Sequence, residues 1–329
     1  MTRGFDLSKA KRGEKLQLRL DAFELADGST VSFPVTIIRG KKPGRTLYVG
    51  ASAHGDEAYA AKAAAQILNE IQPDTISGTL ICVTVENPLA FNARNRFTPL
   101  DDRDNNLSDA FPGKASGDLT DRMANVLHNQ LLLKAEFVVA LHTSDPEYRC
   151  IGYTIVPSVS SQDSSRRAFE LGRIFGLDFI QGPAPGHSFP KSMTNVLTSF
   201  GKPAIIAELG DSRYDSEEEE ISRKGVRGVF NVLKHLGMLE GEPELPISQS
   251  VLGERANLRA DRGGFPIMTV KLGQNVSKGE KVATILNTFG KVVQTIRTPM
   301  SGIVLGRCFR PIVHSGDRFM IIGKIERRV

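Results

Sequence analysis

The chain has 329 residues, of which 40% are hydrophobic and 24% are charged, a composition typical of a globular protein with about two domains. Its net charge is +5, but the basic residues are spread along the chain and are not interleaved with aromatic side chains. This pattern excludes a binder of single-stranded nucleic acid, and we expect no nucleic-acid partner.

The first 240 residues alternate predicted strands and helices. Residues 15–40 have the alternating pattern of a β-hairpin, with a turn at Asp27-Gly28. Beyond the hairpin, apolar runs predict strands at 46–52, 79–86, 136–142, 151–156 and 203–208, and helical spacing predicts helices at 56–71, 119–133, 163–175 and 216–236. This alternation indicates an α/β layer around a largely parallel or mixed sheet.

The pattern changes after a stretch rich in Gly and Pro at 237–246. From about residue 250 no segment has convincing helical spacing, and short β-rich runs separated by Gly-containing turns occur at 267–272, 281–286, 292–297, 302–306 and 318–325. We therefore predict a small all-β barrel or sandwich there. The predicted domains are residues 1–240, which include the hairpin, and residues 250–329.

Two predicted strands end in side chains that can bind a metal. His54 and Glu57 follow the strand at 46–52, just where the next helix begins, and His142 ends the strand at 136–142. Open α/β sheets place their ligands at the carboxyl ends of strands, so these three side chains can converge on one crevice. Two imidazoles and a carboxylate suit a hydrolytic zinc ion, which needs three protein ligands and an open position for water.

Other interpretations of these histidines stay open at this point. The spacing H-x-x-E is common by chance, and a histidine satisfied within a turn would explain His54 equally well. His187 lies in a loop rich in Pro and Gly and is a candidate outer participant. The remaining histidines fit surface or core positions better than ligand positions.

A second carboxylate ends another apolar run. Glu208 closes the segment Ala204-Ile-Ile-Ala-Glu208, where a solvated side chain would be out of place. A buried glutamate is costly unless it is paired or takes part in chemistry. We predict that Glu208 is the general acid/base that a metal-bound water requires, with a structural ion pair as the alternative.

The order of several motifs resembles the succinylglutamate desuccinylase/aspartoacylase family of zinc carboxypeptidase-like hydrolases, and the resemblance spans most of the chain. The motifs are, in chain order, His54-Gly-Asp-Glu57, Glu86-Asn87-Pro88-Leu-Ala-Phe91, Arg96-x-x-Pro99, Phe111-Pro112-Gly113, Leu141-His142-Thr143, Glu208-x-Gly210, Val270-x-x-Gly273-x-x-Val276-x-x-Gly279 and Thr298-Pro299-x-x-Gly302. The resemblance implies a zinc carboxypeptidase-like mixed β-sheet flanked by helices, followed by a barrel-sandwich-like β-domain.

The resemblance also implies roles for individual residues. His54, Glu57 and His142 would hold one Zn²⁺ per chain, and Glu208 would be the base. Arg96 would polarise the scissile carbonyl and hold the oxyanion, an interaction typically worth about 3–4 kcal/mol in the transition state.

One segment departs from the family pattern N-L-N-R-x-F-P-G, whose Asn-Arg pair grips a substrate carboxylate. This chain has Asn106-Leu-Ser108-Asp109-Ala-Phe-Pro-Gly113, so serine and aspartate replace that pair. We hypothesise that Asp109 makes the pocket accept a cationic or neutral group, or that another arginine, such as Arg94 or Arg103, binds the carboxylate. The alternative is that the loop has moved and Asp109 is a solvated turn residue. The candidate substrate-binding residues are Asp109, Ser108, Asn87 and Arg94.

Together these patterns predict a zinc-dependent amidohydrolase that removes an N-acyl group from a small amino-acid-like amine and is not restricted to acidic substrates. A metallocarboxypeptidase or an esterase using the same site is the alternative among enzymes. A non-catalytic metal-binding or sensing protein of the same fold is the alternative from another class. The predicted β-domain lacks a lysine at its hairpin tip, so we interpret it as a structural or oligomer-forming lid rather than a carrier.

The expected compartment follows from the cysteines and the N-terminus. Cys82, Cys150 and Cys308 are widely separated and form no C-x-x-C motif, so we expect no disulfide framework. No apolar signal segment precedes the hairpin, and no run of eighteen apolar residues occurs. We expect a soluble, cytoplasmic protein whose partner is a small N-acylated molecule, with no membrane partner and with a homo-oligomer as an open alternative.

Overall fold

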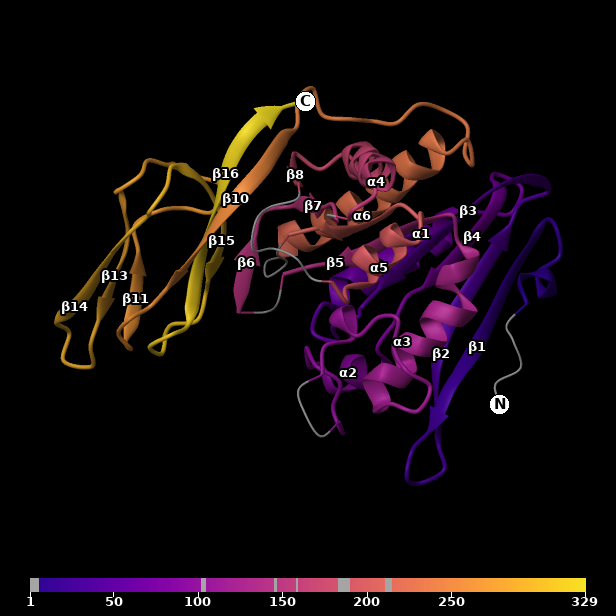
Figure 1. Cartoon of the computed structure of the whole chain (residues 1–329), viewed down its shortest axis with the longest axis horizontal. Coiled ribbons are helices and arrows are strands. Elements are labelled where there is room, and N and C mark those ends of the chain that lie inside the picture. The colour runs from indigo at the N-terminus through magenta and orange to yellow at the C-terminus, as the bar shows by residue number, and fades with distance from the viewer. Residues whose placement is uncertain (1–5, 102–104, 145–146, 158, 183–189, 211–214) are drawn as a thin grey trace.

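A long mixed sheet runs through the whole molecule (Figure 1). The computed structural model describes residues 6–101, 105–144, 147–157, 159–182, 190–210 and 215–329. The strands of the N-terminal part are β1 (Glu14–Glu24), β2 (Thr30–Arg39), β3 (Lys42–Ala51), β4 (Ser77–Val83), β5 (Phe137–His142), β6 (Tyr148–Cys150), β7 (Tyr153–Ile155), β8 (Phe179–Gln181) and β9 (Ala204–Glu208). The C-terminal strands are β10 (Ser250–Arg259), β11 (Phe265–Met268), β12 (Asn275–Val276), β13 (Lys281–Leu286), β14 (Val292–Arg297), β15 (Gly302–Cys308) and β16 (Arg318–Arg328).

The centre of the sheet is parallel, as the α/β alternation predicts. Its strand order is β1-β2-β4-β3-β5-β9-β7-β8-β10-β16-β15-β12, and β6 pairs with β15. Strand β3 lies parallel to both β4 and β5, and β5 lies parallel to β9. The carboxyl ends of β3, β5 and β9 therefore meet at one edge, which is where α/β sheets bind their ligands.

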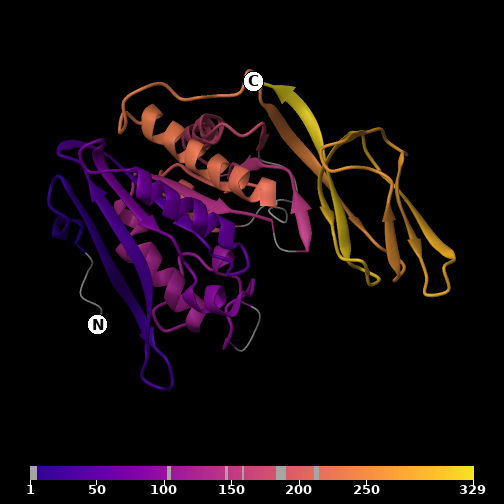
Figure 2. The same ribbon diagram turned by 180° about the vertical axis from the view of Figure 1, so that it is seen from behind.

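Helices cover both faces of this sheet (Figures 1 and 2). The helices are α1 (Ala58–Glu70), α2 (Pro88–Ala93), α3 (Leu119–Gln130), α4 (Gln162–Phe175), α5 (Met193–Ser199) and α6 (Asp215–His235). Apolar side chains of α1, α4 and α6 form one core with β3, β5 and β9. Those of α3 and α5 form a second core with β1 and β2. Burying an apolar stripe of each helix against the sheet fixes the positions of the strand ends.

The C-terminal β-domain, which consists of β10 to β16, is a two-layered sandwich. One layer is β10, β16, β15 and β12, and the other is the three-stranded sheet β11-β13-β14. Its core also contains Tyr148 of β6 and Tyr153 of β7. Strand β10 pairs in parallel with β8, so the main sheet continues into the β-domain without a break in hydrogen bonding. In the described part of the chain, no helix is long and apolar enough to cross a membrane.

The fold class predicted from the sequence is confirmed, and several elements differ from the prediction. The short helices α2 and α5 and the strands β6, β8, β10 and β12 were not predicted. Helix α3 ends at Gln130, and a separate 3₁₀ turn covers Leu132–Lys134. Helices of six or seven residues are too short to show a 3.6-residue period, and three-residue strands are too short to show alternation.

Gly55 marks a very close approach between the loop after β3 and helix α2. A Cβ atom at Gly55 would lie 2.0 Å from the carbonyl carbon and oxygen of Ala90. The Gly55 N–H also donates to the Asn95 carbonyl at 2.9 Å. The loop that carries His54 and Glu57 is thus held against α2 by backbone contacts that any larger residue would push apart.

We therefore predict that Gly55→Ala lowers the free energy of unfolding by about 1–3 kcal/mol, the usual cost of overpacking. Urea unfolding followed by circular dichroism measures this change. The control is Gly263→Ala, because a Cβ there would meet its nearest neighbour at 3.4 Å, an ordinary contact. Equal stability of the two variants would contradict the proposed steric role of Gly55.

Candidate active site and metal centre

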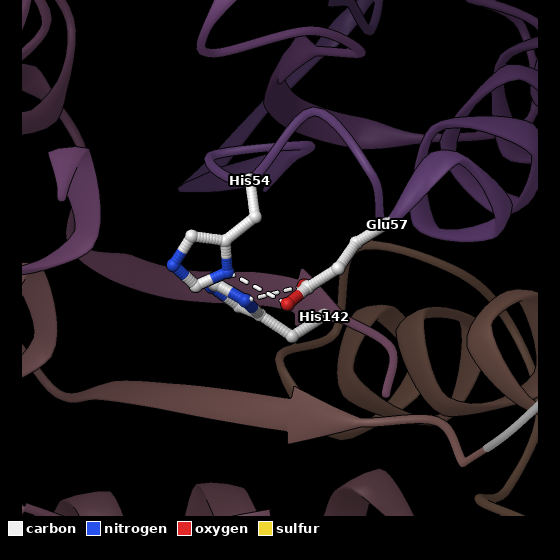
Figure 3. Close-up of side chains that lie close together, drawn as sticks. All are labelled: His54, Glu57 and His142. Carbon is white, nitrogen blue, oxygen red and sulfur yellow. Dashed lines mark hydrogen bonds and ion pairs between the residues drawn. The ribbon is translucent and has the colours of Figure 1, made fainter. Parts of the chain in front are cut away.

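Three buried side chains from two strand ends converge on one point. His54 lies in the loop after β3, Glu57 lies at the start of α1, and His142 is the last residue of β5 (Figure 3). Nδ1 of His54 lies 2.7 Å from Oε1 of Glu57, and Nδ1 of His142 lies 2.8 Å from Oε2. Both imidazoles therefore point the same nitrogen at one carboxylate, and the candidate ligand atoms of the three residues all lie within 4.8 Å of one another.

The electrostatics of this cluster favour positive charge opposite Glu57. Burial alone would raise the pKa of Glu57, but the two imidazoles hold it well below its usual range. Burial opposes protonation of His142, yet the Glu57 carboxylate raises its pKa to about 9. A buried carboxylate with this demand for a positive partner is suited to a cation.

Neighbouring groups hold the three side chains in place. Nε2 of His54 lies 2.9 Å from the Asn106 side-chain oxygen, which fixes the ring orientation. The backbone N–H of Thr143 donates to Glu57 at 3.2 Å, and the Arg96 guanidinium donates to Glu57 at 3.0 Å. The carboxylate is thus held from several sides, which is typical of a preorganised ligand.

The donor set fits a zinc ion. Two imidazole nitrogens and one carboxylate are the ligands of several catalytic zinc sites, in which the fourth position takes water or substrate. The orienting hydrogen bond that Nε2 of His54 donates to the Asn106 side-chain oxygen is the kind of outer contact that accompanies such ligands. His54, Glu57 and His142 are therefore the residues that would hold the metal.

Glu208 lies beside this cluster, at the end of β9. It is paired in register with His142 of the neighbouring strand and is half-buried in the wall of the same cavity. Burial and the nearby Glu57 carboxylate raise the pKa of Glu208 to about 7. Among the described residues, none hydrogen-bonds its carboxylate, so Glu208 can exchange a proton near neutral pH.

The cluster opens into a cavity of about 350 Å³. The wall includes residues predicted from the sequence, namely Arg96, Ser108, Asp109 and Glu208. It also includes Arg255, Asn257, Arg318 and Ile321 from the β-domain. The β-domain therefore supplies part of the pocket surface, which the interpretation as a lid did not specify.

Asp109 belongs to the 3₁₀ turn Leu107–Asp109 and faces the cavity. Its Oδ2 accepts a hydrogen bond of 2.8 Å from the Asn106 side chain. Burial raises its pKa, while His54 and Arg96 act in the opposite direction. The hydroxyl of the neighbouring Ser108 is buried and has no hydrogen-bond partner among the described residues. In this structure Asp109 is thus a pocket residue rather than a solvated turn residue.

The other predicted substrate-binding residues lie elsewhere. Asn87 is fully buried, caps α2 and donates to Thr98 at 3.0 Å, so it supports the loop from behind. Arg94 follows α2, is exposed and does not line the cavity. Arg103 and His187 lie outside the described residues.

Several pocket residues gave no clear signal in the sequence. Gln181 ends β8, Tyr153 begins β7, and Arg255 lies in β10, about 70 residues beyond Gln181. No spacing connects these positions, because β8 and β10 become neighbours only through a long connection. Asn106 is different, because it belongs to the motif Asn106 to Gly113 described above. That motif was the available signal for its contact with His54.

Comparisons with known proteins give a family match and a curated relative. Residues 43–236, more than half of the chain, match the family model described as the succinylglutamate desuccinylase/aspartoacylase catalytic domain. A curated relative, N-alpha-acetyl-L-2,4-diaminobutyric acid deacetylase of Halomonas elongata, is 25% identical over 319 residues, which cover 94% of this chain and 90% of the relative.

Solved structures share the fold over nearly the full length. A succinylglutamate desuccinylase from Silicibacter sp. TM1040 superposes with a TM-score of 0.83 at 24% identity and covers 95% of each chain. The product-bound ectoine utilization protein EutE (DoeB) from Ruegeria pomeroyi superposes with a TM-score of 0.85 at 23% identity, covering 94% of this chain and 95% of the other. These likenesses include the β-domain as well as the sheet that carries the cluster.

We predict that the purified protein binds one zinc ion per chain and that His142→Ala reduces bound zinc to less than a tenth of that value after dialysis. The change removes one of three ligands and leaves the buried Glu57 carboxylate short of a partner. Elemental analysis of the dialysed proteins measures the content. His314→Ala, a change at an exposed histidine of the β-domain, should keep the full content; equal loss in both variants would contradict the assignment.

Proposed function

Because the chain belongs to the succinylglutamate desuccinylase/aspartoacylase family, we propose that it is a zinc-dependent amidohydrolase that removes an N-acyl group from a small amino-acid-like amine. The observation that carries this proposal is the buried His54, Glu57 and His142 cluster beside a carboxylate whose pKa is near 7. The Halomonas elongata relative is named as a deacetylase of an N-acetylated diaminobutyric acid, which is a substrate of this class.

Each residue of the site has a role in this hydrolysis. When bound, zinc would polarise the acyl carbonyl and make water a stronger acid. Glu208 accepts a proton from the attacking water and returns it to the departing nitrogen, a dual role that its pKa of about 7 supports. Arg96 stabilises the negative charge that develops on the acyl oxygen, because its guanidinium lies beside Glu57 at the wall of the cavity.

The charge of Asp109 supports a basic or neutral amine as the product. The position carries a carboxylate at the cavity wall, where an arginine would attract an anionic side chain. Burial raises the pKa of Asp109, whereas His54, Arg96 and the hydrogen bond from Asn106 favour its charged form. We propose that it attracts a cationic side chain of the substrate and repels a second carboxylate.

The direct test is amine release from matched N-acyl amino acids with acidic, neutral and basic side chains. We expect N-acetyl-2,4-diaminobutyrate and neutral members to be hydrolysed, with loss of activity in a chelator and recovery on adding zinc.

Glu208→Gln should lower kcat by about 10²–10⁴-fold without changing zinc content, because the amide keeps the shape but cannot accept the proton.

Other outcomes identify the alternatives. Hydrolysis of peptides only from a free C-terminus would favour a carboxypeptidase, and faster cleavage of acyl esters than of amides would favour an esterase. A protein that binds zinc and these ligands without turnover would be a binding protein, and the proposal would fail.

We also predict that Asp109→Arg changes the ranking of substrates. The new cation should lower kcat/KM for basic substrates by at least about tenfold and raise it for N-acetylaspartate, because the charge facing the side chain is reversed. Kinetics on the same panel measure the ratio. Asp109→Asn, which removes the charge without reversing it, should give an intermediate ratio; an unchanged ranking in both variants would eliminate the charge filter.

A further inference from the structure

Arg255 of the β-domain reaches the active-site cavity with part of its guanidinium unsatisfied. It lies in β10 and lines the cavity together with Glu208 and Tyr153. Its Nη2 is buried and has no hydrogen-bond partner among the described residues. A buried guanidinium donor without an acceptor is costly, and at the wall of a cavity it indicates a missing anionic ligand.

The rest of the Arg255 side chain is held firmly. Its Nε donates to the side-chain oxygen of Gln181, and its guanidinium carbon lies 4.9 Å from the centre of the Tyr153 ring. Gln181 is itself fixed, because its amide nitrogen donates to the carbonyls of Gly182 and Gly253 at 2.9 Å. Arg255 also interacts with the Tyr153 hydroxyl. Nη2 is therefore the donor that remains for a ligand.

The backbone of β10 directs this side chain. Leu252 pairs with Ile325 of β16, and Arg255 pairs with Gly323, so β10 has one residue more than β16 between these pairs. Such a β-bulge turns the strand and changes the side to which the next residues point.

The other arginines near the site are less suited to bind a substrate carboxylate. Arg96 donates to Glu57 at 3.0 Å beside the candidate metal. Arg94 is exposed and does not line the cavity. Arg318 lines the cavity but is exposed and lies over the Tyr148 ring, at 4.9 Å from its centre. Among these four arginines, Arg255 alone combines a cavity position with a buried donor that has no hydrogen-bond partner among the described residues.

We propose that Arg255 binds the carboxylate of the amino-acid part of the substrate. The inference rests on the proposed deacylase function and deepens it. The substrate class is an N-acyl amino acid with a free carboxylate, held by Arg255 from the β-domain, and with a neutral or cationic side chain that meets Asp109. The guanidinium takes over the carboxylate-binding role for which the segment at Ser108 and Asp109 has no basic residue.

The test compares two substrates that differ only in the carboxylate, N-acetyl-2,4-diaminobutyrate acetylated at the α-nitrogen and N-acetyl-1,3-diaminopropane. We expect Arg255→Gln to lower kcat/KM for the carboxylate substrate by about 10–100-fold, the effect of losing a charged hydrogen bond. The value for the descarboxy substrate should change less than about threefold. Arg255→Lys should recover part of the loss, because lysine keeps the charge without the planar fork.

Two control variants make the result specific. Arg259→Gln removes the same charge from the same strand, and Arg259 is exposed and bonds to the Gly316 carbonyl outside the cavity; it should leave both substrates unchanged. An equal loss on both substrates in Arg255→Gln would mean that Arg255 acts through Glu208 or through folding, and would overturn the proposal. A selective loss in Arg318→Gln with none in Arg255→Gln would also overturn it.

A binding measurement separates this inference from the proposed function. Calorimetry with the zinc-loaded protein compares 2,4-diaminobutyrate with 1,3-diaminopropane, and needs no turnover. We expect the wild type to bind the amino acid at least about tenfold more tightly, and Arg255→Gln to lose that preference. If the wild type hydrolyses no panel member but shows this preference, the deacylase proposal fails and the carboxylate site stands; if it shows no preference, the carboxylate site fails.

Discussion

The rest of the site depends on one buried carboxylate. Glu57 lies between two imidazoles at the junction of a strand and a helix, and burying its charge is tolerable only because positive or hydrogen-bonding groups surround it. Those groups come from β5, from the loop after β3 and from Arg96. The parallel pairing of β3 with β5 brings the loop after β3 and the end of β5 together. The packing of α1 on the sheet fixes the position of Glu57 at the start of that helix.

The residues at strand ends were predictable from the sequence because the signal there is local. An apolar run followed by His54, His142 or Glu208 indicates both a strand and the residue at which it ends. Parallel strands have their carboxyl ends at the same edge of the sheet, so these side chains were expected to lie close together. The short helices and strands were not predictable in this way. Strand β10 was also missed, since its segment Ser250-Val-Leu-Gly-Glu-Arg-Ala-Asn-Leu-Arg259 has a bulge that interrupts the alternation of apolar and polar residues.

The partners of the substrate illustrate the same limit. The unusual aspartate at 109 is visible in the sequence because it departs from a motif, and the structure brings it to the cavity. Asp109 stands where the family pattern has an arginine. From the sequence alone, a replacement arginine could be sought only among residues nearby in the chain, which suggested Arg94 and Arg103. The arginine that we propose for this role is instead Arg255, whose position depends on the pairing of β8 with β10 and on the orientation of Gln181. Contacts between residues about 70 positions apart are set by topology, and no periodicity in a single sequence encodes them.

The bulge in β10 has a consequence for how this architecture diversifies. In a strand, successive side chains point to opposite faces, so one inserted or deleted residue exchanges the set that faces the cavity for the set that faces away. The extra residue between Leu252 and Arg255 therefore determines which of the following side chains of β10 face the pocket. A single-residue insertion or deletion at this place would change the side chains that face the cavity without replacing any of the candidate metal ligands. Comparing the length of this strand segment among relatives is thus as informative as comparing the identities of their active-site residues.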